Sequence, residues 1–157
     1  MDPEPVFGHI EAFEDGPAAA EALMRAAKAE RPQKPVVVRF AKDLRGVLDV
    51  AKSRDAVWFD VMRSLQAAGR PVYVEIDRAT GQVSQFLQPR QQPVGQIRET
   101  EGGDFEVELL LSHAVHVLRR AHPRFKELLQ QLQEAQREGK LVWVTETLDS
   151  HEIIEVR

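Results

Sequence analysis

The chain has 157 residues with 21 basic and 25 acidic side chains, a formal net charge of −4 and no cysteine. The absence of cysteine excludes disulfides, thiolate metal sites and a cysteine nucleophile, and the acidic balance gives no overall basic surface for a phosphate backbone. No apolar run approaches the roughly 18 residues of a membrane-spanning helix, and the N-terminus lacks the basic-then-apolar order of a secretory signal, so we expect a cytoplasmic protein without a membrane partner.

The N-terminal part predicts an arm, a helix and a strand. Residues 1–16 lack a regular apolar period, so we expect a flexible arm. The next segment, GPAAAEALMRAAKAE, consists mainly of strong helix formers and has Pro17 in its first turn, which predicts a short helix. The prolines of RPQKP end this helix, because a residue before proline is pushed out of helical geometry. The β-branched run in residues 35–40 then predicts a strand.

The middle of the chain predicts one long helix followed by strands. Apolar residues recur at helical spacing from residue 43 to residue 68, and Gly69 offers a C-terminal cap. The gap around residues 53–55 permits two helices or one, and we favour one long, bent helix because no proline interrupts it. The segments RPVYVEI, PVGQIRE and DFEVELLL, with a further strand around Val83 and Phe86, alternate in polarity and have short connections. This pattern predicts a meander of antiparallel strands.

The C-terminal part predicts an amphipathic helix in HPRFKELLQQLQEAQREGK and then two strands, LVWVTE and HEIIEVR. The whole order predicts an α+β fold: a curved antiparallel sheet or small β-barrel with an N-terminal helix, one long central helix and a helix inserted before the last two strands. We find no internal repeat. We therefore expect one domain over 17–157, helical over 17–70 and β-rich over 71–157.

Histidines and carboxylates near the C-terminus suggest a metal site. Two imidazoles and a carboxylate suit zinc or a non-haem metal, if a curved sheet brings them together. The alternation in SHAVHVL instead points its two histidines to opposite faces of a strand, which favours structural or surface histidines. Our primary expectation is a chain without a metal or other cofactor. The residues of the alternative site are His113, His116, Asp149, His151 and Glu152.

Serine nucleophiles are poorly supported by the sequence. Ser112 precedes His113 and Ser150 precedes His151, but adjacent residues of a strand point to opposite faces, so neither pair can act as nucleophile and base. The chain also lacks a G-x-S-x-G elbow and a glycine-rich phosphate loop. We therefore expect no enzyme activity and no catalytic residue.

Apolar residues nearly encircle one turn of the expected long helix. A helix that is apolar over most of its circumference is buried on more than one side. In so small a domain we expect the second side to meet a partner protein or a second copy of the chain, which predicts a homodimer. The residues of this interaction surface are Val57, Trp58, Val61 and Met62.

The run RRAHPRFK concentrates positive charge, with Arg119, Arg120 and Arg124 as its arginines. We assign these arginines to the same interaction surface, where they would meet an acidic partner. As a second alternative, a barrel could bind single-stranded nucleic acid through them, with Tyr73 stacking on a base. The net negative charge argues against that alternative, so we do not expect a nucleic-acid partner.

The segments PVYVEIDRATGQV…LQPR, EVELLLSHAVHVLRRAHPRFKELL and HEIIEVR together resemble an accessory domain found upstream of protein-glutaminase-type deamidase domains in bacterial multidomain proteins. The resemblance covers roughly the C-terminal half. Those deamidases use a cysteine, a histidine and an aspartate, and this chain has no cysteine, so the resemblance implies a docking, targeting or inhibitory role without the activity. The expected function is a non-enzymatic interaction or regulatory module; the alternative is a metal-binding protein or metal-dependent hydrolase.

Overall fold

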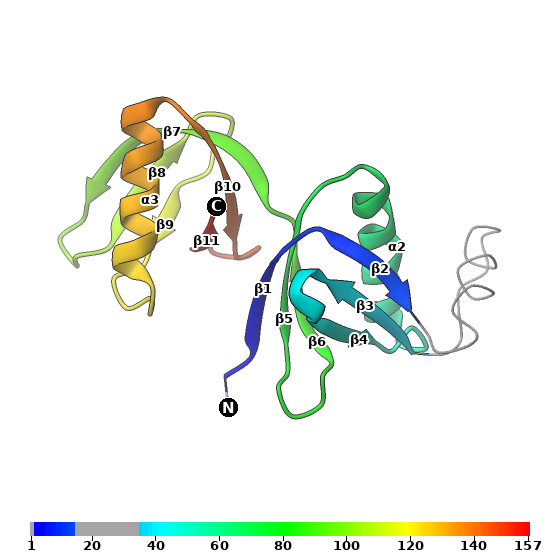
Figure 1. Ribbon diagram of the computed structural model, residues 1–157. Coiled ribbons are helices and arrows are strands. Elements are labelled where there is room, and N and C mark those ends of the chain that lie inside the picture. The colour runs from blue at the N-terminus through cyan, green and yellow to red at the C-terminus, as the bar shows by residue number, and fades with distance from the viewer. Residues whose placement is uncertain (1, 15–34) are drawn as a thin grey trace. The chain divides into compact units, whose positions relative to one another are not determined.

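The computed structural model describes residues 2–14 and 35–157 and divides the chain into two compact units, Met1–Phe86 and Leu87–Arg157 (Figure 1). We call these the first unit and the second unit. Both combine a helix with antiparallel strands, which confirms the mixed helix-and-strand class. We expected a single domain over 17–157, and the two units replace it. The N-terminal helix expected over 16–30 lies outside the described residues.

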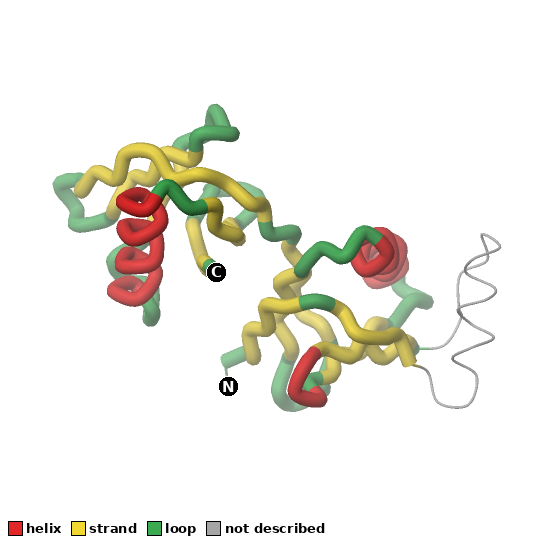
Figure 2. Tube along the Cα trace, turned by 45° about the horizontal axis from the view of Figure 1, so that its top comes forward, coloured by secondary structure: helices red, strands yellow, loops and turns green. Residues whose placement is uncertain are grey.

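The first unit contains two three-stranded sheets among its described residues, in the orders β1-β5-β6 and β2-β3-β4. Strands β1 and β2 follow one another along a single bent path, so that β1 pairs with β5 and β2 pairs with β3 (Figure 2). A parallel bridge between Val47 and Gln82 links the two sheets. The elements are β1 (Glu4–Gly8), β2 (Ile10–Glu14), β3 (Val36–Phe40), the 3-10 turn η1 (Ala41–Asp43), β4 (Arg45–Leu48), α2 (Ser53–Ala67), β5 (Val72–Ile76) and β6 (Val83–Leu87).

Two expectations for this part of the chain are wrong. The flexible arm expected over 1–16 contains β1 and β2, and its apolar residues Val6, Ile10 and Phe13 are buried. The helix expected from residue 43 begins only at Ser53, because residues 45–48 pair with β3 as strand β4. The strand expected over 35–40 is confirmed as β3.

Helix α2 packs against β2 and β4 through apolar residues spaced three apart. Phe59, Met62 and Leu65 are buried, and the Phe59 ring meets the Phe13 ring edge-to-face at 5.2 Å. Gly69, with φ of +66°, ends the helix, and the Arg70 N–H then donates to the Leu65 carbonyl. The helix therefore fills one side of the first unit's core.

The second unit is built on one five-stranded sheet in the order β11-β10-β7-β8-β9, with α3 packed on it (Figure 1). A parallel bridge between Val117 and Glu152 joins its two end strands, and the Val117 N–H donates to the His151 carbonyl at 3.0 Å. The elements are β7 (Arg90–Glu99), β8 (Phe105–Leu109), β9 (His116–Leu118), α3 (Phe125–Glu138), β10 (Leu141–Glu146) and β11 (Ile153–Val156).

Helix α3 follows the amphipathic pattern predicted for it. Leu128, Leu132 and Ala135 recur at spacings of four and three and are buried against the sheet. Gly139, with φ of +63°, ends the helix, and the Lys140 N–H donates to the Ala135 carbonyl. Neither α2 nor α3, the two α-helices among the described residues, is long and apolar enough to cross a membrane.

The two units repeat one fold. Strand β7 occupies the place of β1 and β2 together, and β8, β9, α3, β10 and β11 follow it as β3, β4, α2, β5 and β6 follow β2. The bridge partners Val117 and Glu152 lie 70 positions after Val47 and Gln82. The bridging hydrogen bond recurs as well, since the Val47 N–H donates to the Gly81 carbonyl at 2.9 Å. The absence of an internal repeat, expected from the sequence, is therefore wrong.

Strand registers match between the units too. Both β2–β3 and β7–β8 carry a register shift, after Ile10 and after Val94. From β4 to β6 each residue corresponds to the one 70 positions later, whereas β3 corresponds to β8 at 69 positions, so the β8–β9 loop is one residue longer than the β3–β4 loop. This correspondence gives residues 105–111 and 115–156 of the second unit counterparts in the first unit.

The buried stripe of α3 predicts a large loss of stability when a side chain is shortened. Leu132 is fully buried, so we expect Leu132→Ala to lower the second unit's free energy of unfolding by about 2–5 kcal/mol, because a cavity remains. Urea unfolding followed by Trp143 fluorescence in a Trp58→Phe background measures this unit, since the chain has two tryptophans. The exposed Gln133→Ala on the same helix should change the value by less than about 0.5 kcal/mol. Equal losses in the two variants would contradict the packing described here.

Candidate metal centre

Two histidines and a glutamate come together where the end strands of the second unit meet. Each offers one ligand atom, and these atoms lie within 4.8 Å of one another in the group His116, Glu146 and His151. The Glu146 carboxylate bridges the two rings: Oε2 contacts His116 Nδ1, and Oε1 lies 3.0 Å from His151 Nδ1. The rings meet edge-to-face with centroids 5.5 Å apart. We call these three residues the His–Glu–His cluster.

The outer nitrogen of His116 is also held. His116 Nε2 lies 2.8 Å from Ser112 Oγ, and the Ala114 N–H donates to the same hydroxyl oxygen at 3.2 Å. The His116 side chain is almost fully buried, and both of its ring nitrogens have partners inside the unit. A histidine ligand of a metal ion is typically oriented in this way, by a hydrogen bond from the nitrogen that does not bind the ion.

Irregular backbone in and after β10 orients the side chains of Glu146 and His151. The register between β10 and β11 shifts between Thr145 and Glu146, and such a shift redirects the side chain beside it. His151 has φ of +51°, in the left-handed region that glycine adopts at least cost. Strain of this kind is common where a side chain is needed at a fixed place.

The first unit shows that the fold does not require these side chains. The residues 70 positions before His116, Glu146 and His151 are Gly46, Ile76 and Gly81. Gly81 has φ of +72°, so glycine occupies the position where the second unit has a strained histidine. A Cβ added at Gly46 would lie 2.7 Å from Val83 Cγ2 and 3.4 Å from Ile76 Cδ1. Apolar side chains therefore fill this place in the first unit, and a polar cluster fills it in the second.

Solvent reaches the cluster from the side of His151. The His151 side chain is 43% exposed and the Glu146 side chain 22%, whereas the His116 side chain is 2% exposed. An ion can therefore approach the carboxylate and the His151 ring without displacing the core.

Of the five residues proposed from the sequence, the structure unites two. His116 and His151 join the cluster, whereas His113 and Asp149 are exposed and belong to no such group among the described residues. Glu152 instead accepts a hydrogen bond from Arg119 Nε at 2.9 Å. Sequence reasoning missed Glu146, which ends the predicted strand LVWVTE, and it also missed the contact of Ser112 with His116 instead of with the adjacent His113.

The helix surface expected for protein contacts is largely internal. Met62 is fully buried in the first unit's core and presents no contact surface, whereas Val61 is partly buried against that core. Trp58 packs edge-to-face on Phe86 at 6.1 Å and carries the Arg54 guanidinium over its ring. Val57, 51% exposed, is the most exposed member of this set, and Trp58 and Val61 are partly buried.

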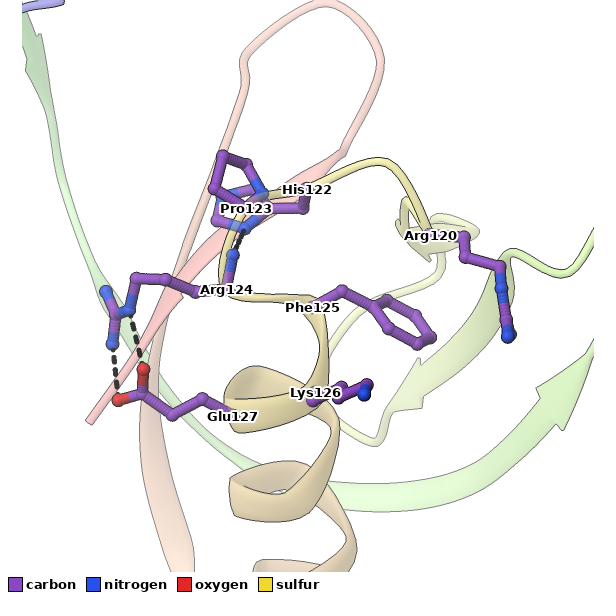
Figure 3. Close-up of a pocket in the computed structure, with 7 residues that line it drawn as sticks. All are labelled: Arg120, His122, Pro123, Arg124, Phe125, Lys126 and Glu127. Atoms are coloured by element: carbon purple, nitrogen blue, oxygen red, sulfur yellow. Dashed lines mark hydrogen bonds and ion pairs between the residues drawn. The ribbon is translucent and has the colours of Figure 1, made fainter.

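The arginines of the basic run are all paired with acids. Arg119 bonds Asp104 as well as Glu152. Arg124 forms a two-pronged pair with Glu127 (Figure 3) and a further bond to buried Glu155. Arg120 lies over the Phe125 ring and 3.9 Å from Glu99. These ion pairs reduce the net positive charge that a phosphate backbone would meet.

The start of α3 forms a shallow pocket in this region. Its lining residues are Arg120, His122, Pro123, Arg124, Phe125, Lys126 and Glu127 (Figure 3). Burial and the nearby Arg124 charge lower the pKa of His122, and His122 Nδ1 accepts a hydrogen bond from the Arg124 N–H. His122 therefore borders the helix start as a neutral acceptor. Tyr73, expected to stack on a base in the nucleic-acid alternative, is buried and donates its hydroxyl to Glu75.

Comparisons of this chain with protein-family models, with curated proteins and with solved structures find no match. The resemblance to an accessory domain of bacterial deamidases stays a prediction.

The positive φ at His151 predicts an unusual order of stabilities. We expect His151→Gly to be more stable than His151→Ala by roughly 1 kcal/mol, because glycine adopts the left-handed region without a Cβ clash. Urea unfolding of the two variants measures the difference. Ser150 does not have a positive φ and serves as the control position. There Ser150→Gly should be less stable than Ser150→Ala. The idea fails if alanine is as stable as glycine at position 151.

Proposed function

We propose that this protein binds a divalent transition-metal ion, with zinc as the first candidate, through His116, Glu146 and His151. The observation that carries the proposal is the gathering of three donor atoms within 4.8 Å at positions where the first unit has Gly46, Ile76 and Gly81. The same fold forms in the first unit without these three polar residues, which supports a role for them in binding.

The chemistry of the donors supports zinc. Imidazole nitrogen and carboxylate oxygen are ligands that Zn²⁺ accepts, and two histidines with one glutamate leave a further position open for water or a ligand. Without an ion, the two Nδ1 atoms share the Glu146 carboxylate by hydrogen bonds. An ion held by these atoms would take the place of the protons between each Nδ1 and the carboxylate.

Zinc titration of the chelator-treated full chain tests the proposal. We expect one ion per chain in isothermal titration calorimetry, and Glu146→Gln should weaken binding by roughly 100-fold or more, because it removes the charged ligand. Ser112→Ala should weaken binding by about 10- to 100-fold, as is typical of a group that orients a ligand. His113→Ala is the matched control, since this exposed histidine lies in the same loop. No stoichiometric binding, or an equal loss in the His113 variant, would refute the metal centre.

A second candidate function is acyl transfer by Ser112, which one observation favours. Ser112 Oγ lies 2.8 Å from His116 Nε2, and His116 Nδ1 contacts the Glu146 carboxylate. Ser112 as nucleophile, His116 as base and Glu146 as the acid that orients the base therefore form a connected chain of contacts. A fluorophosphonate probe tests this in chelator-treated protein. Oγ would bond to phosphorus, fluoride would leave and His116 Nε2 would take the serine proton. Mass spectrometry should place the adduct on Ser112, with none in Ser112→Ala and an unchanged amount in His113→Ala. An unlabelled Ser112 would exclude this function.

The expected role as a protein-interaction module stays a prediction. Val57 is exposed and would take part in such a contact, and Met62 would not, because it is fully buried.

A further inference from the structure

Exposed apolar residues lie next to members of the His–Glu–His cluster along the chain, on the same two loops as the exposed His113 and Asp149. Leu111 is 73% exposed and precedes Ser112, Val115 is 64% exposed and precedes His116, and Leu148 is 84% exposed and lies two residues after Glu146. With Leu110, they make up four of the six large apolar side chains that are exposed in residues 2–14 and 35–157. Single exposed apolar residues are ordinary in proteins, but a gathering on the two loops that carry a site is informative.

The first unit again supplies the comparison. By the strand registers, Leu111 corresponds to Lys42, and Val115 corresponds to Arg45. Leu148, in the turn before the bridge residue Glu152, corresponds to Arg78, in the turn before Gln82. All three counterparts are exposed cations. The fold therefore accepts charged residues at these three places, and the unit that carries the cluster has apolar residues there instead.

We infer that the two loops, residues 110–115 and 147–150, bind the apolar chain of an aliphatic carboxylic acid whose carboxylate occupies the open position of the metal ion. This inference rests on the proposed metal centre. Two neutral imidazoles and one carboxylate leave a bound Zn²⁺ with a net positive charge, which attracts a single anionic head group. These three positions of the two loops offer hydrocarbon contact and no cation, which suits a ligand with one charge and an apolar tail.

A chain-length series tests the inference on the zinc-loaded full chain. Acetate, butanoate, hexanoate and octanoate are titrated in turn by calorimetry. We expect the dissociation constant to fall roughly threefold for each added methylene, because each methylene is withdrawn from water against the loops. A dissociation constant independent of chain length would overturn the inference.

Variants that restore the residues of the first unit sharpen the test. Leu111→Lys, Val115→Arg and Leu148→Arg together should flatten the dependence on chain length to less than about 1.5-fold per methylene. Val57→Lys, an exposed apolar residue of the first unit, is the matched control and should keep the full dependence. An unchanged dependence in the triple variant, or an equal flattening in the control, would also overturn the inference.

Zinc titration of the same proteins separates the two proposals. If the wild-type chain takes up no zinc, the metal centre fails and the ligand assignment fails with it. If zinc binds but the dissociation constant of the acids does not depend on chain length, the metal centre stands and the ligand assignment alone is wrong.

Discussion

The hydrogen bond from the Val117 N–H to the His151 carbonyl holds the end strands of the second unit side by side. Three other strands separate β9 from β11 within the sheet, so this contact is what brings their ends together. His151 is one partner of this hydrogen bond, and His116 directly precedes the other partner, Val117. The contact that curls the sheet therefore also fixes the distance between the imidazoles, and the site depends on the fold being closed at this point.

The polar cluster is stable at that seam because its buried groups satisfy one another. An unpaired polar group away from water costs free energy, but Ser112 and Glu146 pair with the two ring nitrogens of His116. Glu146 is in turn paired with His151. The first unit meets the same packing problem with Ile76 and Val83 against Gly46. The same backbone fold thus accommodates apolar side chains at this place in the first unit and a hydrogen-bonded polar cluster in the second. The polar groups satisfy one another only when all of them are present.

Sequence periodicity predicted most of the second unit, including the stripe of α3 and the strands ending at Glu146 and Arg157. It failed where short apolar runs fit two periods: Val47 and Leu48 fit a helix stripe and also a strand that pairs with β3. It missed the repeat because only eight of the 44 position pairs between residues 43–86 and 113–156 are identical, among them Val47 with Val117, Gly69 with Gly139 and Val72 with Val142. The convergence of His116 with His151 could not be predicted, because it arises from the meeting of end strands and not from spacing along the chain.

The close approach at Gly46 sets a condition for grafting the cluster onto the first unit. Histidine at positions 46 and 81 and glutamate at position 76 would reproduce the donor set on the same backbone. A Cβ at position 46 would lie 2.7 Å from Val83 Cγ2, however, so the graft would need a smaller residue at position 83 before any ligand could be placed. The branched side chain of Val83 thus blocks a side chain at position 46, and the volume at this one core position decides whether the fold can hold a metal-ligand set there.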